Sequence, residues 1–186
     1  MRFAAFLLMS CVVPLAACKQ QPEVKAKDAS VAEVAKKVRE SGADQSMVRP
    51  GLWQSKVTID QLDMPGMPAD MADRMKAMMA ERQPHDYQTC LTPEDVKRPK
   101  EDFFAGKNNE CRYDNFTMGD GKIDAVMHCG KGDSQQTMQM AGTYSPERYE
   151  MQMSTKSEGG EAAQRGMAMR MRVEAHRIGE CTGKEG

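Results

Sequence analysis

The chain has 186 residues and a formal net charge of -1, so it is long enough for one ordinary domain with a real core. Lys and Arg are spread along the whole sequence, which argues against nucleic acid as a partner because no basic stripe exists. With 18 methionines and only 5% aromatic residues, methionine must supply much of the core volume.

The N-terminus has the pattern of a bacterial export signal. Arg2 is followed by an apolar stretch from Phe3 to Val13, which is shorter than the roughly 20 residues that span a bilayer. Leu15-Ala16-Ala17-Cys18 resembles a lipobox, so we expect residues 1–17 to be a lipoprotein signal peptide and Cys18 to carry the lipid. In this resemblance Lys19 implies an outer-membrane protein facing the periplasm. The alternative is an ordinary signal peptide and a soluble periplasmic protein.

Residues 18–48 are polar and predict a tether between the lipid and the folded domain. The tether contains one possible short helix. Ser30 and Glu33 have capping-box spacing, and Gly42 can end the helix. Three apolar residues recur between them at helical spacing: Val31, Val34 and Val38.

The main domain is expected at 49–181, with a tail at 182–186. Its first strand runs from Trp53 to about Leu62. A helix from about Ala69 to Arg82 follows, and we expect it to cover the sheet. Its apolar face consists of Met71, Met75, Met78 and Met79.

The next segments predict a short strand, a short helix and a hairpin. The strand covers about Asp86 to Leu91, and Thr92 can cap a helix that has Pro93 in its first position. Further on, two alternating segments flank the turn signal Gly119-Asp120-Gly121.

Four cysteines remain once Cys18 is assigned to lipid, and an oxidising compartment favours two disulfides. Four cysteines allow three pairings. A hairpin centred on Asp120 places Cys111 opposite Cys129, and elimination then leaves Cys90 with Cys181. A thiolate zinc site is the alternative, but no Cys/His pair has zinc spacing.

Three more segments alternate strictly between apolar and polar residues, at about Gln136 to Tyr144, Arg148 to Lys156 and Met167 to Ile178. The fold class is therefore mainly β (α+β). We expect an antiparallel meander of about seven strands, curled or barrel-like.

Methionines occupy the alternate positions of these strands and form their apolar face. They are Met138, Met140, Met151, Met153, Met167, Met169 and Met171. The simplest interpretation is a core packed with methionine. One alternative is a periplasmic copper(I) site whose ligands come from Met138, Met140, Met151, Met153, Met167 and Met169, because thioethers select Cu(I). The other is an adaptable groove for a lipid or a peptide.

Nothing in the sequence predicts catalysis or a cofactor. His85, His128 and His176 lie in no metal or triad motif, and no G-x-S-x-G, H-E-x-x-H or phosphate-binding glycine loop is present. We therefore expect a noncatalytic binding or structural module.

Five motifs in order resemble a known family over about Arg49 to Cys181. They are Arg49-Pro-Gly-Leu-Trp53, Met64-Pro-Gly-Met-Pro68, Cys90-Leu-Thr-Pro-Glu-Asp95, the pair Cys111 and Cys129, and Arg177-Ile-Gly-Glu-Cys181. The family is the bacterial envelope domain of unknown function numbered three thousand six hundred and seventeen. The resemblance implies an exported, β-rich domain with two disulfides and no established activity.

Overall fold

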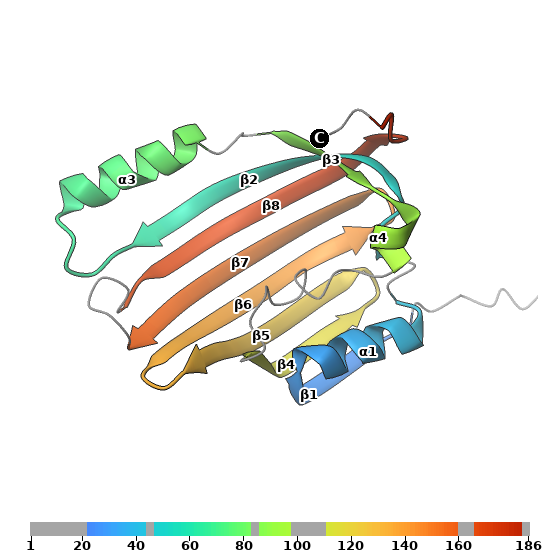
Figure 1. Ribbon diagram of the computed structural model, residues 1–186, viewed down its shortest axis with the longest axis horizontal. Helices are drawn as coiled ribbons and strands as arrows, with labels where there is room; N and C mark the ends of the chain where they lie inside the picture. Colours follow the sequence, from blue (N-terminus) through green and yellow to red (C-terminus); the bar gives the residue numbers. More distant parts are fainter. Residues whose placement is uncertain (1–21, 44–46, 83–85, 98–110, 160–165, 184–186) are drawn as a thin grey trace, which may run out of the picture.

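The structure is a computed structural model that describes residues 22–43, 47–82, 86–97, 111–159 and 166–183 (Figure 1). Eight antiparallel strands form one sheet in the order β1-β4-β5-β6-β7-β8-β2-β3. The strands are β1 (Val24–Ser30), β2 (Gly51–Asp63), β3 (Tyr87–Leu91), β4 (Cys111–Gly119), β5 (Lys122–Lys131), β6 (Ser134–Ser145), β7 (Arg148–Gly159) and β8 (Ala168–Gly179). The helices are α1 (Val31–Ser41), α3 (Ala69–Arg82) and α4 (Pro93–Lys97). The predicted antiparallel β fold is confirmed, and the sheet is open, not closed into a barrel.

Strands β4 to β8 form the predicted meander, in which each strand pairs with the next along the chain. The β4–β5 turn follows the turn signal: Asp120 has a φ of 48° and Gly121 a φ of 71°. These positive φ angles suit Gly and tolerate Asp, so the turn is short and sets the register. Lys122 lies opposite Gly119 as a result.

The segment from Val24 onward differs from the polar tether that we expected over 18–48. β1 pairs with β4 at the edge of the sheet, and α1 follows it directly. The helix has the predicted capping box, since the Ser30 side chain accepts from the Glu33 backbone N–H and the Glu33 carboxylate accepts from the Ser30 N–H. Val34 and Val38 are buried in the main core. The folded part of the chain therefore begins by Val24.

Each strand alternates, so the sheet has one apolar and one polar face. One fully buried part of the apolar face lies under α1, where Tyr113, Phe116 and Met118 of β4 are buried together with β5 residues. The edge-to-face rings of Tyr113 and Phe116 have centroids 5.4 Å apart. Helix α1 packs mainly on β1 and β4, so this core occupies one side of the sheet.

Helix α3 has the predicted bounds but not the predicted position. It lies along the outer edge of β2 and contacts that strand, instead of covering the apolar face (Figure 1). Met71 and Met78 are each 51% exposed. The reason is topological: β3 pairs only with residues 51–55 of β2, so α3 leads the chain back beside the unpaired remainder of that strand.

Candidate functional site

The four cysteines of the described domain form the two pairs that the sequence predicts. Cys111 and Cys129 are directly opposite each other in the β4–β5 ladder, with Cα atoms 4.1 Å apart. Cys90 of β3 is bonded to Cys181, just after β8, with Cα atoms 5.5 Å apart. The predicted lipidation site, Cys18, and the predicted signal peptide lie outside the described residues.

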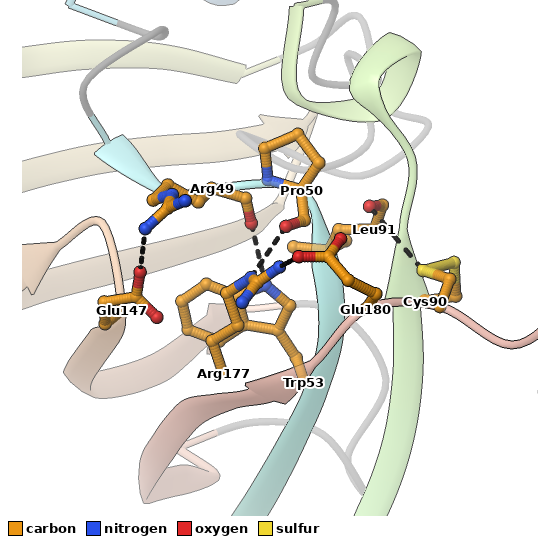
Figure 2. A network of polar contacts seen from close by, with 9 residues as sticks. Arg49, Pro50, Trp53, Cys90, Leu91, Glu147, Arg177 and Glu180 are labelled. Carbon is orange, nitrogen blue, oxygen red and sulfur yellow. Dashed lines mark hydrogen bonds and ion pairs between the residues drawn. A yellow bond between two sulfur atoms is a disulfide. The ribbon is translucent and has the colours of Figure 1, made fainter.

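A polar cluster joins the two ends of the main domain, and we call it the Arg177 cluster (Figure 2). The Arg177 Nε–H donates to the Pro50 carbonyl at 2.8 Å, and its guanidinium also contacts the Glu180 carboxylate. The Trp53 indole N–H donates to the Arg49 carbonyl at 2.9 Å. Its other members are Glu147, which forms an ion pair with Arg49, and Gly51.

Gly51 is required at the centre of this cluster. Its φ is 141°, a backbone conformation that side chains disfavour. A Cβ there would lie 2.4 Å from both the Arg177 Nε and the Gly179 carbonyl oxygen. The motifs at both ends of the domain therefore fit together because residue 51 has no side chain.

The Arg177 cluster is structural, because its polar groups are engaged with one another. Trp53 is 1% exposed and packs against Tyr149 with ring centroids 5.6 Å apart, so it is a core residue. Burial raises the pKa of the Tyr149 hydroxyl. The apolar side of this corner, around Trp53 and Tyr149, is accordingly shielded from water, whereas Arg49, Glu147 and Glu180 are exposed.

The methionine face lies between this corner and the core under α1. The registers align its inward residues in three rows across β6, β7 and β8. The rows are Gly142, Met151 and Val173; Met140, Met153 and Met171; and Met138, Thr155 and Met169. Six of these nine positions are methionines, and the described helices make their main contacts elsewhere, with β1, β4 and β2.

Burial differs within these rows. Met151 is 7% exposed, whereas Met138, Met140, Met153, Met169 and Met171 are only half-buried. Burial raises the pKa of Tyr113, under α1, to about 12. The apolar face is thus buried at both ends and partly exposed in its middle. Of the copper ligands considered from the sequence, Met167 lies before β8 and outside the rows, and Met171 takes a central place instead.

One polar arrangement was not predicted from the sequence. On the polar face, the His128 Nε2 lies 2.8 Å from an Asp114 carboxylate oxygen, and its Nδ1 lies 3.0 Å from the Thr137 hydroxyl. The register places His128 opposite Thr137, a relation that only the strand pairing reveals. Because the His128 and Asp114 side chains are 44% and 53% exposed, water reaches both groups, and we interpret this as a surface network. His176 is also exposed on this face, and His85 lies outside the described residues.

Two kinds of site are not found in the described part of the chain. No group of three or more His, Cys, Asp or Glu side chains is arranged to hold a metal ion there. Nor does any described helix combine the length and the apolar character needed to cross a bilayer.

Comparison with known proteins decides the family. The family model described as "Protein of unknown function (DUF3617)" matches residues 48–181, which includes the Arg177 cluster and both disulfides. The chain belongs to this family. Neither the curated proteins nor the solved structures include a significant match. The DUF3617 match begins at residue 48, whereas the sheet of this chain also includes β1 and is covered by α1.

Proposed function

We propose that this protein is an exported envelope lipoprotein, anchored through Cys18, whose methionine face binds the acyl chain of a lipid without catalysing a reaction. Export is supported by the N-terminal signal pattern and by the two disulfides, which persist in oxidising compartments. The lipobox resemblance and Lys19 favour the outer membrane, with the domain in the periplasm.

The short link to the anchor favours a membrane-derived ligand. Only residues 19–23 separate Cys18 from β1, and a chain of that length spans at most about 20 Å. The sheet is then held close to the bilayer surface. A lipid chain is therefore the nearest abundant apolar partner, which favours it over a peptide.

The single observation that carries the binding proposal is the half-exposed apolar middle of the methionine face. None of the nine positions in its three rows carries a charge, and an acyl chain requires that. Methionine side chains are unbranched and flexible, so they can adapt to a chain that has no fixed shape.

A fluorescent fatty acid tests the proposal on the purified protein. Met153→Lys places a charge in the middle row and is expected to abolish binding, because the ammonium would be desolvated by the bound chain. Met78→Lys makes the same change at the exposed edge helix and should leave binding intact. No binding by the unaltered protein, or equal binding by the Met153→Lys variant, would refute the proposal.

The anchor needs a separate test, because the ligand could bind to an unanchored protein. Cells expressing the protein are treated with globomycin, which blocks the lipoprotein signal peptidase. We expect the unprocessed precursor to accumulate, and Cys18→Ser to give the same precursor without the drug. Normal processing in both experiments would show that Cys18 is not the lipidation site.

A further inference from the structure

Three methionines on neighbouring strands face one another in a single row. Met140 lies opposite Met153 in the β6–β7 ladder, and Met153 lies opposite Met171 in the β7–β8 ladder. Neighbouring strands are about 4.8 Å apart, and directly opposed residues bring their side chains together. Met153 is thus the centre of a row of three thioethers.

The surroundings of this row suit a soft cation and no other kind. Among the nine inward positions of the three rows, Thr155 carries the only side-chain oxygen, and none carries nitrogen. Cations that prefer oxygen or imidazole nitrogen lack ligands there. Thioethers select Cu(I), and the absence of positive side chains from these positions leaves the ion without local repulsion.

Met151, in contrast, is fixed by packing and is not part of the site. A Cβ at Gly142 would lie 2.4 Å from the Met151 sulfur, so this sulfur occupies the space that the missing side chain leaves. Met151 is also the most buried methionine of the three rows. Met140, Met153 and Met171 are half-buried, so an ion can reach them from solvent.

We propose that Met140, Met153 and Met171 bind one Cu(I) ion through their three sulfur atoms. With metal–sulfur bonds of about 2.3 Å, the length known for zinc, three sulfur atoms around one ion would lie about 4 Å from one another. Each methionine has three rotatable side-chain bonds, which lets Met140 and Met171 lean toward Met153. The inference does not depend on lipid binding or on the anchor.

Silver(I) is the probe of choice, because it shares the charge and filled d shell of Cu(I) but needs no reductant that would open the disulfides. The purified protein is treated with N-ethylmaleimide to block free thiols and is then titrated with Ag(I) by calorimetry and native mass spectrometry. We expect one ion per protein. Met153→Leu should weaken binding by more than about tenfold, since it removes the central ligand.

Met78→Leu is the matched control, because it makes the same exchange at an exposed methionine outside the row. Leu replaces Met with little change in volume, so each variant is expected to fold, and its thermal unfolding checks this. Silver binding unchanged in the triple Leu variant of Met140, Met153 and Met171 would overturn the proposal. So would the absence of a bound ion in the unaltered protein, whatever the result with fatty acid.

Discussion

Gly51 fixes the corner where the first and last motifs of the family domain meet. Replacing it with Ala forces a Cβ against Arg177 and the Gly179 carbonyl in a backbone conformation that disfavours side chains. We expect Gly51→Ala to lower the free energy of unfolding by about 2–4 kcal/mol, measured by urea denaturation. Gly42→Ala is the control: its φ of 72° is also positive, but no atom lies within 4 Å, so about 1 kcal/mol is expected. Equal losses would mean that crowding at residue 51 is unimportant.

The Glu33 carboxylate gives the start of α1 a pH dependence. Hydrogen bonds from the Ser30 backbone N–H and hydroxyl hold the pKa of Glu33 below its usual value. Because the folded pKa is lowered, the stabilisation is present above the unfolded pKa and is lost as pH falls through the folded pKa. Unfolding measured between pH 7 and pH 3 should therefore show a smaller acid loss for Glu33→Gln than for the unaltered protein. An identical acid loss in both would contradict the prediction.

At the scale of elements, the helix-start and turn signals predicted local structure well. Three predictions that depend on neighbouring residues agree with the structure: the capping box at Ser30, the bounds of α3 and the hairpin at Asp120. β1 was missed because its inward residues are mostly alanine. In addition, Asp28 has a φ of 50°, which interrupts the alternation that marks a strand.

The position of a helix depends on the topology, which the sequence pattern does not contain. Both α1 and α3 show an apolar stripe, yet Val34 of α1 is fully buried while the methionines of α3 lie at an edge. At this edge, α3 shields unpaired backbone groups of β2 from pairing with a strand of another chain.

Helix α1 is expected to stabilise the whole sheet, because Val34 and Val38 are part of the main core. Val34→Ala removes buried methyl groups and should lower the free energy of unfolding by about 1.5–3 kcal/mol. Val31→Ala, at the partly buried first turn, should cost less than half of that. The comparison is made by urea denaturation. If neither substitution changes the transition, α1 does not belong to the cooperative domain.

At the scale of the whole molecule, the two disulfides lie at diagonally opposite corners of the sheet. Cys111 and Cys129 crosslink β4 and β5 at one end, whereas Cys90 and Cys181 join the β3 edge to the end of β8. The chain-entropy relation gives about 3 kcal/mol for the separation of 18 residues and about 4.5 kcal/mol for that of 91. Replacing Cys90 and Cys181 by Ala should therefore lower the free energy of unfolding more than replacing Cys111 and Cys129. The reverse order in denaturation experiments would contradict this.

The methionine face shows which features of a binding site a sequence pattern can predict. Alternation alone predicts that the methionines share a face, but the choice of Met140, Met153 and Met171 as direct neighbours depends on strand registers. Those registers follow from turn lengths that a sequence pattern leaves open by one or two residues. A strand register shifted by two residues would keep the face apolar, but these three methionines would no longer lie opposite one another.

Methionine oxidation by dilute hydrogen peroxide, followed by peptide mass spectrometry, tests the central claim that the methionine face is an open ligand surface. We predict that Met140, Met153 and Met171 oxidise at measurable rates in the ligand-free protein and become protected when palmitate is added. The exposed Met71 and Met78 should oxidise at the same rate with and without palmitate. Inert thioethers in the row before any ligand is added, or unchanged oxidation rates after it, would contradict the account.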